Sequence, residues 1–384
     1  MKMVAKHEQV SRKQDINHLA ETYKPLFSKR YFCLFSSIIL IFCAITLSLL
    51  SFSTSLKITF ASLIFLALFL LWLPRLPERL FPYALSIPSL LILLAITVVP
   101  IGFLVLVSFH RVTLVNFRKD WPFVGLENYV FLAKEDPLFL PCLVRSLQLL
   151  IFGLIFQLIL GMALAVLLNR KFKLRNVVST VLLLPVMTNS IVIGMLWKYM
   201  LNYYNGFINL LLMKFGIPAQ PWLTNQVLPG VRSLPVVGAW LGQRLNLNFA
   251  FFSIISTNTW QWTPMVFLLL SAGLASLPSE PFEAAKVDGA SGWQIFRYLT
   301  LPMLRPVIKV VLVIRGIDIM KTFGMIWALF GNAPITSTLN IHIHTVGLYT
   351  HNYGRSSALS LLVVGLTLLL YLLFQKVFPE GETR

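Results

Sequence analysis

The chain has 384 residues, of which 57% are hydrophobic and only 12% are charged, and its mean hydropathy is +0.78. This composition excludes an ordinary soluble domain. Apolar runs of about 20 residues, long enough to cross a hydrocarbon core of ~30 Å, recur along the chain. Because β-barrel strands would be shorter and alternating, the sequence predicts an all-α, polytopic membrane helix bundle with about eight transmembrane helices.

The net charge is +18, but the basic residues gather between the apolar runs and not in one patch. They cluster in residues 1–30, around Arg75 and Arg79, and again in residues 170–175. Cytoplasmic loops of membrane proteins carry an excess of Lys and Arg, so these clusters indicate the cytoplasmic side. The predicted external loops also carry an excess of positive charge, so an anionic solute is an alternative.

The first part of the chain is predicted as a cytoplasmic segment, residues 1–30, and two accessory transmembrane helices within residues 31–82. These spans lie at about 31–51 and 58–73. The first is interpreted as a retained helix because its apolar run exceeds that of a signal peptide and lacks a clear cleavage signature. A third span at about 83–109 and an external loop make up residues 83–142.

Residues 143–376 are predicted to form the core transmembrane domain. Its spans are expected at about 143–168, 177–200, 249–277, 307–330 and 357–374. Within the second of these, Pro185 predicts a kink at mid-membrane depth, and Thr188 and Asn189 beside it are candidates for lining a path, with helix packing as the alternative. A short interfacial helix is expected at 208–215. An even number of spans beginning inside places both termini in the cytoplasm.

A helix–glycine–helix element lies between two of the predicted spans, at residues 278–302. Ser279 is expected to cap its first helix, Pro281 fits the first turn, and Glu283 places a carboxylate where the helix dipole favours it. Gly289 is expected to end that helix. A polar loop rarely needs so many capping and terminating residues.

The second helix of this element is amphipathic. Ser291 is expected to cap it, and Trp293 lies on its apolar face. We expect the helix to end at Leu301, because Pro302 disfavours helical backbone at the preceding residue. The alternative reading of such a helix is an amphipathic segment lying in the lipid interface.

This element closely resembles the EAA loop of permease subunits of binding-protein-dependent ABC importers, in the carbohydrate-uptake branch typified by maltose permeases. Residues 125–129, Gly-Leu-Glu-Asn-Tyr, also resemble the start of that family's external loop. The resemblance covers about residues 83–374 and implies a type I importer permease fold. The residues that would form the ATPase-coupling loop are Glu283, Ala284, Ala285, Asp288, Gly289, Trp293, Leu301 and Pro302.

In that family the loop docks into a cleft on the ATPase subunit. Glu283 would brace the loop through ionic or hydrogen bonds, Gly289 would allow its turn, and Trp293 with Leu301 would fix it to the bundle. Two departures are visible. The large domain that the maltose permease carries after its third span is missing, and residues 331–334 replace the usual glycine-rich turn after the seventh span.

The chain has no phosphate-cradling motif, since no Gly is followed by Lys anywhere. We therefore expect no enzyme activity and no cofactor in this chain, with ATP and Mg bound by a separate ATPase. The resemblance implies two ATPase subunits, a second permease in a heterodimeric pair, an extracytoplasmic solute-binding protein and a bacterial or archaeal plasma membrane. No nucleic-acid partner is expected.

Three charged residues in the seventh predicted span, Arg315, Asp318 and Lys321, are spaced three apart and so lie on roughly one helical face. An ionised side chain in hydrocarbon costs ~2.5–3.5 kcal/mol on translocon scales, so this face should meet protein or water. It is either a structural charge cluster or part of a translocation path. The same residues would be the coupling relay of an ion-coupled secondary carrier, which is the rival function.

The sixth predicted span carries Asn258, Gln261 and Trp262 near its middle. Amides bond sugar hydroxyls and aromatic faces stack against C–H patches, so these are candidates for contact with a sugar or polyol. Ordinary packing between helices is the alternative. A non-sugar solute such as a phosphate ester is a further alternative.

The remaining reactive side chains suggest no metal site. Cys33, Cys43 and Cys142 lack metal-ligand spacing. His342 and His344 are two residues apart, on opposite sides of a helix, and no carboxylate is near them in the sequence. No nucleophile elbow of a hydrolase is present.

Overall fold

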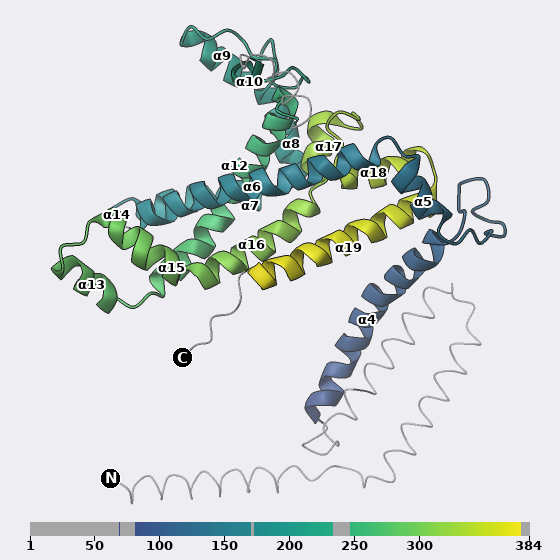
Figure 1. Cartoon of the computed structure of the whole chain (residues 1–384), viewed down its shortest axis with the longest axis horizontal. Helices are drawn as coiled ribbons and strands as arrows, with labels where there is room; N and C mark the ends of the chain where they lie inside the picture. Colours follow the sequence, from purple (N-terminus) through teal and green to yellow (C-terminus); the bar gives the residue numbers. More distant parts are fainter. Residues whose placement is uncertain (1–68, 70–80, 170–172, 233–245, 378–384) are drawn as a thin grey trace, which may run out of the picture. The chain divides into compact units, whose positions relative to one another are not determined.

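The computed structural model describes Phe69 and residues 81–169, 173–232 and 246–377 (Figure 1). These residues are mainly helical, and their only β-structure is three isolated bridges. The predicted all-α bundle is therefore confirmed. The chain divides into two compact units, residues 1–100 and 101–384. In the first, the described residues are Phe69 and the larger part of α4 (Phe81–Ser108), which matches the third predicted span. Apart from Phe69, the first two predicted spans lie outside the described residues.

Four long helices of the second unit pack against one another: α6 (Phe139–Leu168), α12 (Phe249–Ala275), α16 (Arg305–Met320) and α19 (Tyr353–Val377) (Figure 1). Their apolar core includes the fully buried Ile254 and Leu359. Small residues let the backbones approach closely. At Gly161 of α6 an added Cβ would lie 2.6 Å from Val266 of α12, so only glycine fits there.

The fifth predicted span is broken more sharply than expected. Helices α7 (Arg175–Met187) and α8 (Ser190–Met200) meet at 100°, with the break at Thr188 and Asn189 just after the predicted kink at Pro185. The Asn189 side chain accepts a hydrogen bond from the Ile191 amide at 2.8 Å and so caps α8.

The prediction of one continuous seventh span was wrong. Helix α16 ends at Met320, and α17 (Gly324–Phe330) begins after a gap of three residues. Backbone groups at such a break need other partners. The Asn340 side chain supplies one, because its Nδ2 donates to the Met320 carbonyl at 2.5 Å. A side chain twenty residues further along the chain therefore bonds the backbone at the break.

Helices α8 and α17 pack against each other across Gly194. An added Cβ at Gly194 would lie 2.6 Å from both the Met325 carbonyl oxygen and the Ala328 Cβ. We expect Gly194→Ala to destabilise the protein by about 1–3 kcal/mol through overpacking. Gly102→Ala in α4 is the matched control, since nothing lies within 4 Å of an added Cβ there. Thermal unfolding of the two variants in detergent checks this, and equal stabilities would contradict the close α8–α17 packing.

The shorter elements lie between and around these helices. Helix α9 (Phe207–Lys214) starts and ends within one residue of the interfacial helix predicted at 208–215. By length and composition, three helices of the described ranges could cross a membrane, or up to five if each bent pair forms one span. The other elements are α5 (Glu127–Lys134), α10 (Pro229–Arg232), α13 (Glu280–Val287), α14 (Gly292–Ile295), the π-helix η2 (Phe296–Thr300), α15 (Leu301–Met303), α18 (Leu339–His344) and the π-helix η3 (Thr345–Tyr349).

Candidate translocation site and coupling loop

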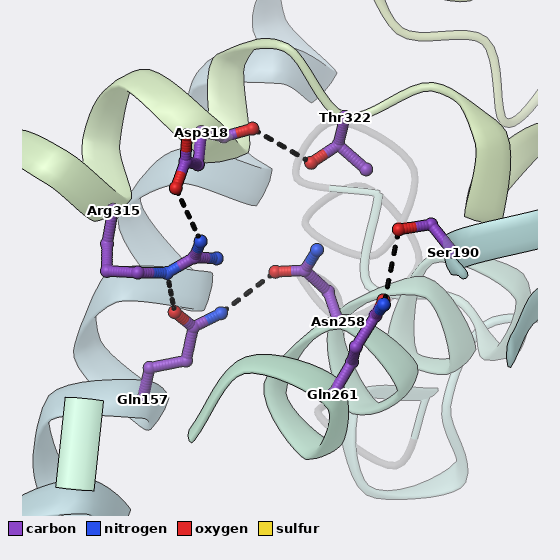
Figure 2. A network of polar contacts seen from close by, with 7 residues as sticks. All are labelled: Gln157, Ser190, Asn258, Gln261, Arg315, Asp318 and Thr322. Carbon is purple, nitrogen blue, oxygen red and sulfur yellow. Dashed lines mark hydrogen bonds and ion pairs between the residues drawn. The ribbon is translucent and has the colours of Figure 1, made fainter. Parts of the chain in front are cut away.

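A buried polar cluster joins α6, α12 and α16 (Figure 2). Gln157 Nε2 donates to Asn258 Oδ1 at 2.9 Å, and Arg315 Nε donates to Gln157 Oε1 at 3.0 Å. All three side chains are at most 1% exposed. Gln157 was not among the predicted site residues. The signal that could have found it is its position as the one polar side chain in the apolar run of residues 149–168.

Arg315 is held from three sides. Besides Gln157 it contacts Asp318, with Nη1 3.1 Å from Oδ2, and its guanidinium lies 4.3 Å from the centre of the Trp262 ring. This arrangement is an ion pair combined with a cation–π contact. Lys321, the third member of the predicted face, lies beyond the end of α16, is exposed, and has no ion-pair partner among the described residues.

A pocket of about 260 Å³ opens where both helix breaks meet the unbroken α12. Ser190 comes from the first break and Thr322 from the second. Gln261 of α12 donates to the Ser190 hydroxyl at 3.2 Å (Figure 2). The same nitrogen donates to the Thr188 carbonyl at 3.3 Å. The residues lining the pocket are Ser190, Gln261, Trp262, Asp318, Lys321, Thr322, Phe323, Gly324 and Met325.

Two buried amide atoms in this region have no hydrogen-bond partner among the described residues. They are Gln261 Oε1, on a side chain that is 1% exposed and lines the pocket, and Asn258 Nδ2 in the polar cluster. A buried polar atom without a partner carries a penalty of about 1–3 kcal/mol. A solute hydroxyl that donates to Gln261 Oε1 would remove that penalty.

The predicted path residues thus divide into three groups. Gln261, Trp262, Asp318 and Lys321 line the pocket, and Asn258 and Arg315 lie behind it in the polar cluster. The other two act on the backbone. The Thr188 hydroxyl bonds the Leu184 carbonyl at 3.0 Å, and Asn189 serves as the cap of α8.

The helix–glycine–helix element is present, with one difference at its start. Gly289 has φ of +78°, in the left-handed region that favours glycine, and α13 ends just before it. Ser291 and Gln294 form a reciprocal capping box that starts α14. The predicted cap at Ser279 was wrong. Ser279 already has helical backbone angles, and its side chain makes no capping bond.

The helix also continues past Pro302, so its predicted end at Leu301 was wrong. A π-helix, η2, precedes α15, and the Leu301 amide bonds the carbonyl of Phe296 five residues earlier. This wider turn changes which carbonyl lies beside the next residue. Pro302 then falls in the first turn of α15, where its missing N–H is tolerated.

Helix α13 is exposed: it has no buried residue, and Val287 is 87% exposed. The Glu283 side chain is exposed and makes no hydrogen bond or ion pair in the part of the chain that the structure describes. A cleft of about 400 Å³ lies inside the bend at Asp288 and Gly289. Trp293 stacks on Phe296 and is 66% exposed.

One histidine has a partner that the sequence did not reveal. His342 Nε2 lies 2.7 Å from Asp136 Oδ2, and both side chains are buried. The two residues are 206 positions apart, so their contact depends on the packing of α18 against the start of α6. In the described ranges no three metal-ligating side chains come together.

Apolar helices around a buried polar cluster, together with an exposed helix–glycine–helix loop, define a multi-pass membrane transport subunit. Residues 157–380 match the family described as binding-protein-dependent transport system inner membrane component, and the chain belongs to this family.

Two relatives align with most of the chain. It is 32% identical to the trehalose/maltose transport system permease protein MalF of Thermococcus litoralis over 296 residues, which are 77% of this chain and 92% of that protein. It is 29% identical to the trehalose transport system permease protein SugA of Mycobacterium tuberculosis, over 80% of this chain and 93% of that one. Each alignment therefore includes more than nine-tenths of the relative's own length.

The fold also matches a solved structure, that of a bacterial ABC transporter involved in the import of the acidic polysaccharide alginate. The TM-score is 0.63 at 22% identity, over 78% of this chain and 96% of that one.

Proposed function

We propose that this chain is the permease subunit of an ATP-driven ABC importer and forms half of the pathway by which a sugar or related polyol crosses the membrane. The observation that carries the ATP-driven reading is the loop from α13 to α14. It is a defined helix, turn and capped helix whose first helix has no residue buried by the described chain. Such an element, held in shape but uncovered, is suited to a partner protein.

The partners follow from this role. We propose two ATPase subunits that bind ATP and Mg, a second permease, and an extracytoplasmic solute-binding protein, in a bacterial or archaeal plasma membrane. This chain would bind no cofactor. ATP binding would move the coupling loop, and the helices joined by the polar cluster would tilt together, so that the pocket opens alternately to each side.

The pocket supports a hydroxyl-bearing solute. Gln261 offers an unused acceptor, and Thr322 and Ser190 add hydroxyls nearby. One face of Trp262 is covered by Arg315, so that face does not stack on a sugar ring. Lys321 lines the same pocket without an ion-pair partner in the described chain, which favours a phosphate ester or other anionic solute as the second candidate.

The contacts of Arg315 do not support the alternative function, an ion-coupled secondary carrier. Arg315 is fixed by Gln157, Asp318 and Trp262, which is the arrangement of a structural ion pair and not of a relay that changes partners. Family membership also favours the importer.

The proposal is tested by purifying the tagged chain from its native membrane in mild detergent and identifying the proteins that accompany it. We expect an ATPase and a second permease, and ATP-dependent uptake of a sugar after reconstitution with the binding protein. Reproducible transport by the chain alone without ATP would overturn the proposal. ATP-dependent uptake of anionic solutes only would support the second candidate.

Gln261→Leu is expected to lower uptake by about tenfold while leaving the assembly intact, since a lost hydrogen bond in a buried site is worth about 1–3 kcal/mol. Thr259→Val is the matched control. Thr259 lies on the opposite face of α12, is buried, and its hydroxyl has no partner among the described residues. Initial uptake rates and recovery of the complex are measured together. Loss of assembly in Gln261→Leu would favour the packing role.

A further inference from the structure

An apolar groove of about 830 Å³ separates α6 from the coupling loop. One wall is the second half of α6, where Leu158, Met162 and Val166 follow one another at helical spacing. The other wall contains Trp293 and Phe296. Every side chain that lines the groove is apolar. A groove of this kind on membrane-spanning helices suits a hydrocarbon chain.

A basic residue lies beside the groove. Arg305 stands three residues before Ile308 on α16, and Ile308 lines the groove, so Arg305 lies on the same face of that helix. Arg305 is exposed, and its side chain has no hydrogen bond or ion pair among the described residues. A guanidinium without a partner, next to an apolar groove, fits a phosphate group, which it can bond through two N–H groups at once.

The depth of the groove in the membrane is indicated by two further features. Helix α6 ends at Leu168, shortly before Lys173 and Arg175, which belong to a basic turn of the kind found on the cytoplasmic side. Trp293, 66% exposed, is the type of side chain that sits at the boundary between hydrocarbon and water. The groove therefore reaches the level of the lipid headgroups of the cytoplasmic leaflet.

We propose that this groove binds an anionic phospholipid of the cytoplasmic leaflet, with an acyl chain along α6 and the phosphate on Arg305. The lipid would contact Trp293 and Phe296 of the coupling loop directly. The anionic lipid content of the membrane would thereby affect the position of the loop. This site is separate from the solute pocket and does not depend on which solute is carried.

The test uses the assembled transporter in phosphatidylcholine nanodiscs that contain phosphatidylglycerol with a photoreactive acyl chain. Labelled peptides of α6 are quantified by mass spectrometry. We expect Arg305→Gln to lower labelling of residues 158–167 by about fivefold, the factor that ~1 kcal/mol per basic residue near an anionic surface represents. Arg305→Lys should retain most of the labelling. Arg175→Gln, which removes a basic residue outside the groove, should leave it unchanged.

A second variant tests the groove itself. Ala163 lines it and is exposed, so Ala163→Trp fills the groove without entering the core. We expect this change to abolish labelling by photoreactive phosphatidylglycerol and phosphatidylcholine alike. Labelling that is unaffected by both Arg305→Gln and Ala163→Trp would overturn the proposal. So would a photoreactive amino acid at position 163 that crosslinks to the partner permease or to residues 31–73 and not to lipid.

Discussion

Replacing Arg315 with methionine is expected to destabilise the protein by about 3 kcal/mol, near the lower end of the cost of removing one partner of a buried ion pair. The change leaves the Asp318 carboxylate and Gln157 Oε1 without their donors. Asp318 is 37% exposed, so water can replace part of what it loses. The measurement is the thermal midpoint of the assembled complex in detergent, together with uptake, which we expect to be lost.

Two controls separate the ion pair from a general effect of charge. Lys321→Met removes a basic residue only six positions away that has no ion-pair partner in the described chain, and should change stability little. The double variant Arg315→Met/Asp318→Asn removes both charges and should be more stable than the single one. A single variant as stable as the native protein would show that the polar cluster does not hold α6, α12 and α16 together.

Replacing Gly289 with valine is expected to abolish uptake and to release the ATPase subunits. The φ of +78° costs an L-residue about 1–2 kcal/mol, and more when the side chain is β-branched. No atom lies within 4 Å of an added Cβ, so the effect would come from the backbone and not from crowding. The loop would relax by moving α13 relative to α14.

The same position offers a graded comparison. Gly289→Asn should keep more activity than Gly289→Val, because Asn tolerates the left-handed region. Gly292→Ala is the matched control, since Gly292 has ordinary backbone angles and an added Cβ would meet nothing within 4 Å. Co-purification of the ATPase and uptake rates are compared across the three. Full ATPase retention in Gly289→Val would remove the loop from its proposed role.

The long apolar helices could be predicted from the sequence because the length of each apolar run gives the length of the helix. Helix α12 was predicted to within two residues at its end, and α4 to within two at its start. The second break could not be predicted in this way. Its backbone is bonded by Asn340, a residue that no local pattern connects with Met320. The helix end predicted from Pro302 was also wrong, because the preceding π-helix changes which carbonyl the proline ring faces.

Part of the candidate site was also visible in advance. Charged and amide side chains in an apolar span are rare enough to mark Arg315, Asp318 and Gln261. Their partners were not visible. Gln157 meets Arg315 across 158 positions, and only the packing of α6 on α16 decides this contact. The role of Asn189 as a helix cap depends on a bend whose size the sequence does not record.

The Gln157–Asn258 contact has a consequence for biosynthesis. The two residues are 101 positions apart. At a synthesis rate of about 5–20 residues per second, Asn258 emerges roughly 5–20 s after Gln157, and Arg315 later still. During that time α6 holds an amide for which the chain has not yet made a partner. The interior of this bundle is therefore completed only when its late helices return to α6, and in a truncated or stalled chain the Gln157 amide lacks these partners.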